Sequence, residues 1–152
     1  MKKASSILVV RVGKLDAEDP LDALRVVIAQ HGYSWFGKYG RPIGDRCFSP
    51  NMLDVVCIAY RRERKYVLTP FRRLAVSRTP PPDLIYPAYY SRLKSRISTW
   101  IKLAPIDLPA FTLDDFQVSS SGLNLVHAFQ SSMSSHFLCR FRTTSHYDLF
   151  AR

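Results

Sequence analysis

The chain has 152 residues, of which 47% are apolar and 22% charged, the size and composition of one globular domain with a core of its own. No apolar run approaches the roughly 20 residues that a membrane-crossing helix needs, and the run at residues 7–10 is too short for a secretory signal. We therefore expect a single domain over residues 1–152, a cytoplasmic location and no membrane partner.

The positive charge is concentrated in the middle of the chain. The net charge is +10, and residues 55–106 hold eleven Lys and Arg against two acids, Glu63 and Asp83. A concentrated cationic field attracts phosphate backbones and accelerates association. The charge therefore favours a nucleic acid as partner; the alternative is a solvated basic surface that binds nothing specific.

A buried strand and a well-delimited helix are predicted near the start. Residues 7–12, ILVVRV, form a largely β-branched run typical of a strand buried on both faces. Asp19 can cap the following helix, Pro20 suits its first position and Gly32 can end it. Residues 33–39 are then predicted to be extended, before a Gly/Pro-rich loop.

The middle of the chain predicts a hairpin and an irregular excursion. Strands are expected at residues 52–60 and 66–76, joined by the charged turn RRERK, with Pro70 at an edge position or a bulge. SRTPPPD at residues 77–83 predicts a stiff extended connector. Residues 85–97 are ambiguous, because helical spacing is confined to their second half.

The last third of the chain predicts two strands and short helices. STWIKLAPI at residues 98–106 alternates as a strand does, residues 112–115 have a capping-box pattern, and residues 136–142 form the last strand. We expect an α+β fold: a small mixed, mostly antiparallel β-barrel flanked by short helices.

One short stretch combines aromatic rings, glycines and cations. HGYSWFGKYGRPIG, residues 31–44, holds four aromatic side chains, four glycines, Lys38 and Arg41. A flat ring can stack on a nucleobase for about 1–3 kcal/mol, glycines let the backbone approach a ligand, and a cation can hold the flanking phosphate. The stretch suits a pocket for a nucleobase; the alternative is that Trp35 and Phe36 are core rings.

The residues do not predict an active site. Residues 84–106 contain no acid, so the converging carboxylates of a two-metal nuclease are missing there, and no G-x-x-x-x-G-K-[ST] phosphate loop occurs. The three cysteines and the histidines match no usual zinc pattern. We therefore expect no catalytic residue, metal or cofactor. The alternative is a metal-free ribonuclease whose acid–base pair comes from the histidines His127, His136 and His146.

The order of the predicted elements, over about residues 7–142, resembles that of the EVE domains, which belong to the PUA-like superfamily together with the YTH and ASCH modules. The similarity lies in the layout of strand, capped helix, aromatic–Gly segment, hairpin, Pro/Tyr excursion, STWIKL and the Ser-rich approach to the last strand. The Gly-Asp pair frequent before the third strand of EVE domains is replaced here by Asn51-Met52-Leu53-Asp54.

The resemblance implies a non-catalytic reader that captures a modified base of double-stranded DNA. A methylated or hydroxymethylated base would leave the helix and enter an aromatic pocket. Such modules often serve as the sensing part of a modification-dependent restriction or defence system, with a nuclease or other effector as partner. An RNA-binding PUA-like module and a protein-interaction domain with incidental charge are the alternatives.

The resemblance also assigns residues to the two parts of the site. The base-binding residues expected are Tyr33, Ser34, Trp35, Phe36, Lys38, Tyr39, Trp100 and Ser132, with Ser131, Ser134 and Ser135 in the same approach to the last strand. The phosphate-binding residues expected are Arg41, Arg61, Arg62, Arg64, Lys65, Arg72 and Arg73.

Overall fold

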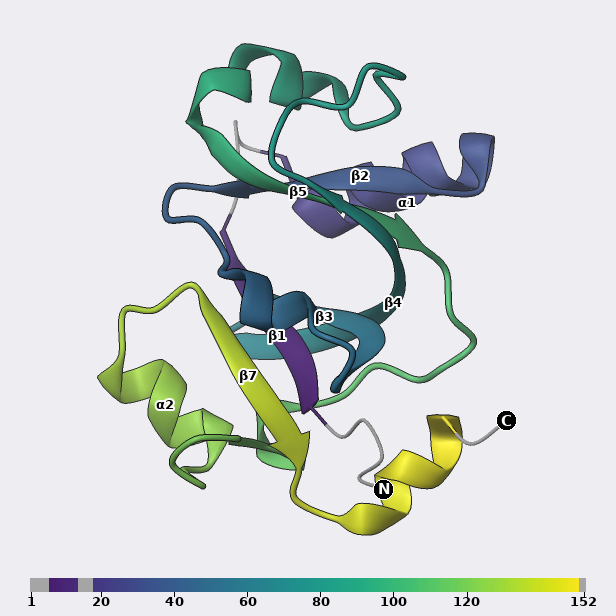
Figure 1. The fold of residues 1–152 in the computed structure, drawn as a ribbon. Helices are drawn as coiled ribbons and strands as arrows, with labels where there is room; N and C mark the ends of the chain where they lie inside the picture. The colour runs from purple at the N-terminus through teal and green to yellow at the C-terminus, as the bar shows by residue number, and fades with distance from the viewer. Residues whose placement is uncertain (1–5, 14–17, 151–152) are drawn as a thin grey trace.

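A computed structural model describes residues 6–13 and 18–150 of the protein, and Figure 1 shows their arrangement. The strands are β1 (Ser6–Val12), β2 (Ser34–Tyr39), β3 (Met52–Arg62), β4 (Lys65–Ser77), β5 (Ile97–Ala104), β6 (Phe116–Val118) and β7 (His136–Phe141). The α-helices are α1 (Pro20–His31) and α2 (Leu125–Ser131), and the 3-10 turns are η1 (Asp45–Phe48), η2 (Ala88–Arg92), η3 (Lys94–Arg96), η4 (Leu113–Asp115) and η5 (Thr144–Phe150).

The described strands form one mixed sheet of seven, in the order β2-β5-β4-β3-β1-β7-β6. The pair β1–β3 is parallel and the other five pairs are antiparallel. The α+β class and the mostly antiparallel sheet are thus confirmed. In Figure 1 the sheet curls into a C, with β2 and β5 on one arm and β1 and β7 on the other.

The expected barrel is wrong, because the sheet does not close. Strands β2 and β6 lie at its two edges and do not pair with each other. The outer edge of β2 is occupied by a loop instead, since the Trp35 N–H donates to the Ile85 carbonyl at 2.9 Å. Strand β6 has only three residues before the chain turns toward α2. An opening therefore remains between β2 and the β1–β7 pair.

Strand β1 separates two hydrophobic cores. Leu8 and Val10 face the inside of the C, where they pack with Leu24 of α1. Ile7 and Val9 face the other side, in a core that includes α2. Because successive side chains of a strand point to opposite faces, the predicted β-branched run serves both cores.

The helix signals act as predicted. The Asp19 carboxylate accepts hydrogen bonds from the N–H groups of Leu21 and Asp22, and Pro20 opens α1. Gly32 ends the helix in the left-handed region at φ 81°, and its N–H donates to the Ile28 carbonyl. The capping box at residues 112–115 is also present, although the segment forms the single turn η4. These ends depend on residues close in sequence, so they were predictable.

Candidate nucleic-acid interface

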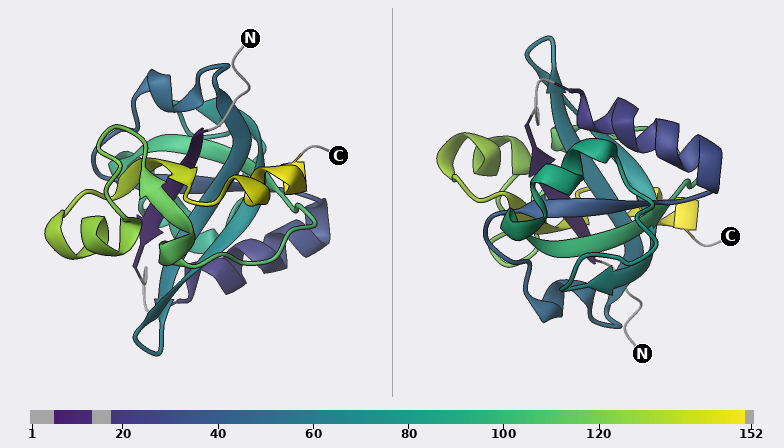
Figure 2. Two further views of the ribbon diagram at one scale, coloured as in Figure 1. Left: turned by 90° about the horizontal axis from the view of Figure 1, so that it is seen from below. Right: turned by 90° about the horizontal axis from the view of Figure 1, so that it is seen from above.

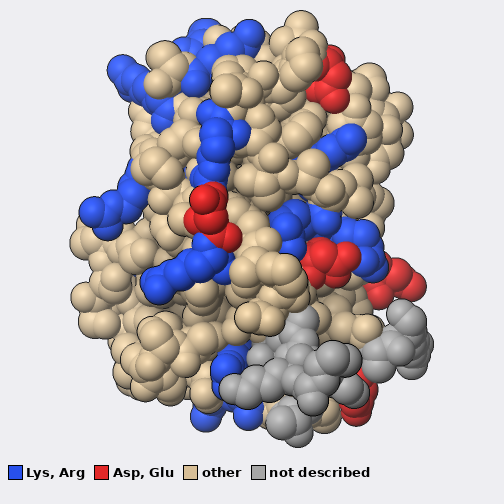
Figure 3. Space-filling model, viewed as in Figure 1, with Lys and Arg blue, Asp and Glu red and all other residues tan. Residues whose placement is uncertain are grey.

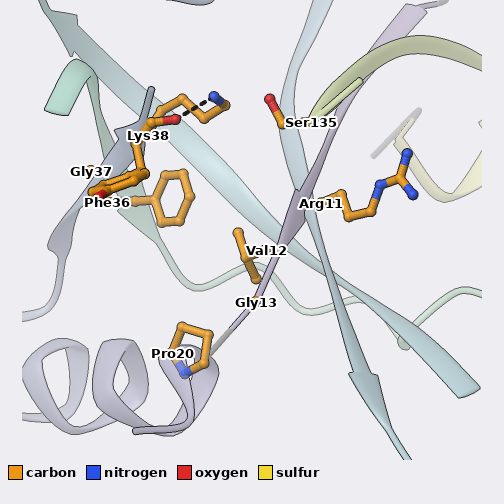
Figure 4. Close-up of a pocket in the computed structure, with 9 residues that line it drawn as sticks. Arg11, Val12, Gly13, Pro20, Phe36, Gly37, Lys38 and Ser135 are labelled. Atoms are coloured by element: carbon orange, nitrogen blue, oxygen red, sulfur yellow. Dashed lines mark hydrogen bonds between the residues drawn. The ribbon is translucent and has the colours of Figure 1, made fainter. Parts of the chain in front are cut away.

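A cavity of about 220 Å³ lies in the opening between β2 and the end of β1. In Figure 4, Phe36 and Lys38 border it on one side, Val12 and Ser135 on the other, and Pro20 lies below. The lining residues are Arg11, Val12, Gly13, Pro20, Phe36, Gly37, Lys38, Tyr39 and Ser135. The cavity exists because the sheet stays open: hydrogen bonding between the two arms would leave no space there.

Lys38 places a buried positive charge at this cavity. Its side chain is only 4% exposed, and the ammonium donates to the carbonyls of Tyr39 at 2.6 Å and Arg41 at 3.1 Å. No carboxylate of residues 6–13 or 18–150 is recorded within 4 Å of it. An ammonium has three N–H donors, so one remains for a guest, and burial lowers the pKa of Lys38.

Arg11 fastens the serine segment that borders the cavity on the other side. Its guanidinium donates to the carbonyls of Phe129, Ser132 and Ser134 at 2.7–3.0 Å and lies 4.2 Å from the centre of the Phe129 ring. Its backbone N–H donates to the Ser135 carbonyl. In Figure 4 the guanidinium points away from the cavity. Arg11 was not predicted as a site residue; its one signal is a lone cation within ILVVRV.

The predicted base pocket is divided between the two faces of β2. Phe36, Lys38 and Tyr39 line the cavity. On the other face, Trp35 packs with Trp100 in a buried aromatic cluster. The Trp35 indole N–H and the Tyr33 hydroxyl both donate to Asp83, at 3.3 and 2.8 Å. Strand alternation separates Phe36 and Lys38 from Trp35, and the register shift between Lys38 and Tyr39 interrupts that alternation before Tyr39.

The two predicted serines have structural contacts outside the cavity lining. Ser34 is fully buried, and its hydroxyl donates to the Trp35 carbonyl. Ser132 contributes its carbonyl to the contact with Arg11. Ser135 is the serine that reaches the cavity. The structure thus brings three of the eight predicted base-binding residues together, and base binding itself stays a prediction.

Gly37 is required for packing against the aromatic cluster. A Cβ at this position would lie 2.8 Å from the Ile97 Cδ1 and 3.2 Å from the Tyr90 ring. A side chain at position 37 would therefore force the Ile97 side chain or the Tyr90 ring to shift if strand β2 is to keep its approach to the η2–η3 segment. This packing role of Gly37 differs from the predicted role of the glycines, which was to let the backbone approach a ligand.

The predicted phosphate-binding cations fall into two groups. Arg62 pairs with Asp19 and Asp22, and Arg72 pairs with Asp54. The Arg73 guanidinium lies 5.6 Å from the Phe48 ring centre. Four are exposed and form no recorded ion pair within the described part of the chain: Arg41, Arg61, Arg64 and Lys65.

In Figure 3, acidic side chains lie against Lys and Arg near the middle of the face in view, and further Lys and Arg side chains gather at its upper left. An ion-paired cation must give up its carboxylate to bind phosphate, so the unpaired group is better placed for that contact.

The residues of the enzymatic alternative lie on separate elements. His127 is exposed on α2, His136 begins β7, and His146 lies in η5 against Phe111 and Phe141. Burial lowers the pKa of His136, and the charges of Lys38 and Arg41 lower it further.

The cysteines have the environment of buried hydrophobic residues. All three are buried and free, and burial raises the pKa of each thiol. Within the residues described, no group of three His, Cys, Asp or Glu side chains could hold a metal ion. The helices described include none with the length and apolarity to span a bilayer.

Comparison with known proteins finds no matching family model, no matching curated protein and no matching solved structure.

Proposed function

We propose that the protein is a nucleic-acid reader that receives a modified base of double-stranded DNA in the cavity between β1 and β2. The observation that carries the proposal is the buried Lys38 ammonium at a cavity of about 220 Å³. Pockets for drug-sized ligands are roughly 300–1,000 Å³, so this cavity suits a smaller guest, such as one planar base.

The cavity walls supply the two kinds of contact that a flipped base needs. Phe36, Val12 and Pro20 offer apolar surface to the faces and edge of a ring. Lys38 offers a donor, and the Ser135 hydroxyl is both a donor and an acceptor. A base extruded from its stack is held by such contacts to its edge and faces. A hydroxymethyl oxygen is an acceptor of the kind that Lys38 can bind.

The proposal extends to the family and to the biological setting suggested by the layout. The chain would be an EVE-like member of the PUA-like superfamily that senses modification for a restriction or defence system. A separate nuclease or other effector would then act on the marked DNA. The support is the order of the elements, with an α-helix after the first strand and an aromatic edge strand bordering the cavity.

The test compares duplexes that differ at one central base: cytosine, 5-methylcytosine or 5-hydroxymethylcytosine, and adenine or N6-methyladenine. Binding is measured by fluorescence anisotropy at two salt concentrations. We expect one modified duplex to bind at least about tenfold tighter than its plain counterpart, equal to about 1.4 kcal/mol. The ratio should persist at both salt concentrations, because base capture releases no counterions.

A cavity-filling variant provides the matched control. Val12→Phe places a ring in the cavity, so it should abolish the preference for the modified base and leave binding to plain DNA unchanged. Val26→Phe makes the same substitution on an exposed face of α1 and should keep the preference. Equal binding of all duplexes by the wild type rejects the proposal.

The alternatives predict different outcomes in parallel assays. An RNA-binding module would prefer single-stranded or structured RNA to every duplex. A metal-free ribonuclease would cleave labelled RNA in the presence of chelator and lose that activity on substitution of His127, His136 or His146 by Ala. A protein-interaction domain would bind every nucleic acid weakly, with strong dependence on salt.

A further inference from the structure

A second hollow, of about 630 Å³, lies between the β3–β4 hairpin, η4 and α2. We call it the hairpin hollow. Its cations are Arg11, Arg61, Arg64 and Lys65, and its acid is Asp114. The Asp114 carboxylate already accepts hydrogen bonds from Arg142 at 2.8 Å and Asn124 at 2.9 Å. The hollow therefore has a large excess of positive charge.

Three of these cations are available to a ligand. Arg61, Arg64 and Lys65 are exposed and form no recorded ion pair with a described residue. Arg62, in the same hairpin, is paired with Asp19 and Asp22 of the α1 end. The acids at the start of α1 thus neutralise Arg62, whereas no ion pair recorded among the described residues neutralises the other three cations. An anion bound in the hollow that they line would reduce the repulsion among them.

The shape of the hairpin presents these charges outward. In both views of Figure 2 the β3–β4 hairpin extends beyond the rest of the chain. Glu63 and Arg64 form its turn at φ 49° and 70°, a backbone conformation in which hairpins prefer Asn and Gly. The tip of the hairpin thus holds Glu63 and the cation Arg64 in a backbone conformation that favours smaller residues.

The floor of the hollow is aromatic. The Tyr66 ring meets the Phe129 ring edge to face, with centroids 4.9 Å apart. The guanidinium of Arg11 lies over Phe129 and is held by three carbonyls. Arg11 also lines the cavity between β1 and β2, so the hollow and the cavity adjoin on either side of this one residue.

We propose that the hairpin hollow is a second binding site, which holds the phosphodiester backbone of a nucleic-acid strand through Arg61, Arg64 and Lys65. The strand is the one whose base enters the cavity, and this last clause rests on the proposed function. Phosphates would lie against the three cations, with sugars or bases above Tyr66. Cations that contact phosphates release the counterions condensed on the strand.

The test is the salt dependence of binding to a plain duplex. The triple variant R61Q/R64Q/K65Q should bind at least tenfold more weakly than the wild type at low salt. The slope of log K, where K is the association constant, against log salt concentration should be less negative than that of the wild type by about 2.7. This is about 0.9 for each of three phosphate contacts. Thermal unfolding of each variant establishes that it is folded.

A second triple variant controls for net charge. R25Q/R78Q/K102Q removes the same three charges from cations that are already engaged: Arg25 and Arg78 are ion-paired with Asp22 and Asp45, and the Lys102 ammonium lies 4.1 Å from the Tyr33 ring centre. It should keep a slope close to that of the wild type. Equal slopes for the two triple variants would show that only bulk charge matters and would overturn the site. Absence of DNA and RNA binding by the wild type at low salt would also overturn it.

The same measurement separates this site from the proposed function. If the wild type shows no preference for any modified base but the two triple variants differ in slope, the hollow stands and base capture fails. If R61Q/R64Q/K65Q keeps the wild-type preference for the modified base at reduced affinity, both stand.

Discussion

The two faces of β2 have opposite characters, although they alternate residue by residue along the strand. On one face, Trp35 and Gly37 meet Trp100 and Tyr90 in a closely packed aromatic cluster. On the other, Phe36 and Lys38 border an open cavity. The first face leaves too little room for a single added Cβ, and the second has room for a guest.

The difference shows that aromatic residues and binding surface need not coincide. The indoles are the side chains best suited to stack on a base, yet here they fill a layer between the sheet and the η2–η3 segment. That layer holds β2 in place, and the geometry of the cavity depends on the position of β2. We infer that the packed face supports the open one and that substitutions on the two faces will have different effects.

The largest effect is expected from Trp100→Ala on the packed face. The side chain is fully buried, with ring centroids 5.1 Å from Tyr86 and 5.5 Å from Tyr90. Removing it should lower the free energy of unfolding by about 3–5 kcal/mol, measured by chemical denaturation. Tyr39→Ala, on the half-exposed rim of the cavity, should cost much less. A loss below about 1 kcal/mol for Trp100→Ala would contradict close packing of this face.

Gly37→Ala tests the same face with a smaller change. Its Cβ would lie 2.8 Å from the Ile97 Cδ1, and overpacking of this kind costs about 1–3 kcal/mol. The double variant with Ile97→Val removes that methyl group and should recover part of the loss. A double-mutant cycle from four denaturation curves measures the recovery; strict additivity would show that the two residues do not meet.

Lys38→Met tests the open face, where we expect loss of binding and a smaller loss of stability than for Trp100→Ala, since the ammonium also donates to the carbonyls of Tyr39 and Arg41. A hydrogen bond from a charged donor contributes about 1.5–3 kcal/mol, so affinity for a 5-hydroxymethylcytosine duplex should fall by about tenfold or more. Affinity for the plain duplex should change little. Lys102→Met, whose ammonium lies over the Tyr33 ring, is the matched control. An equal loss for both duplexes would mean that Lys38 only fastens the loop at residues 39–41.

The smallest effect on stability is expected from protonation of Asp83, which lies beside the packed face. Burial by itself raises the pKa of Asp83. Hydrogen bonds from the Ile85 N–H, Tyr33 and Trp35 outweigh it and hold the pKa below its ordinary value of 3.8. The ionised form is thus favoured in the folded state, so its contribution to stability is full above pH 3.8 and is lost as the pH falls through the lowered pKa.

Melting temperatures of the wild type and Asp83→Asn against pH measure this contribution. The difference between the two should be constant near neutral pH and shrink toward zero in acid. Because Asp83 is exposed, the difference should be small. A difference that grows as the pH falls would contradict the assignment.

Several parts of the fold could be predicted because their determinants are local. The strand at residues 7–12, the two hairpin strands around RRERK and the last strand all lie close to their expected bounds. Residues 85–97 were ambiguous because 3-10 turns have no strong periodicity of their own. Pro70 is tolerated because the recorded pairing of β4 with β5 begins only at Arg72.

The binding residues were predicted less well, because a residue type indicates its chemistry but not the side of the strand on which it acts. Tyr33, Trp35 and Trp100 were expected with Phe36 in one pocket, and the register of β2 against β5 places them away from it. Ser135 was expected near the pocket but Arg11 was missed, because 124 positions separate the two residues and only the pairing of β1 with β7 brings them together.

The sequence by itself determined the net charge of this protein, which needs only a count of residues. It also determined the caps of α1, the two-faced first strand and the cationic hairpin turn, since each of these depends on residues within a few positions. The tertiary structure alone decided that the sheet stays open, that Lys38 is buried without a recorded carboxylate partner among the described residues, and which arginines are neutralised. Those outcomes depend on which distant segments meet. The edge of β2 is taken by the loop at Ile85, and each cation's partner lies elsewhere in the chain.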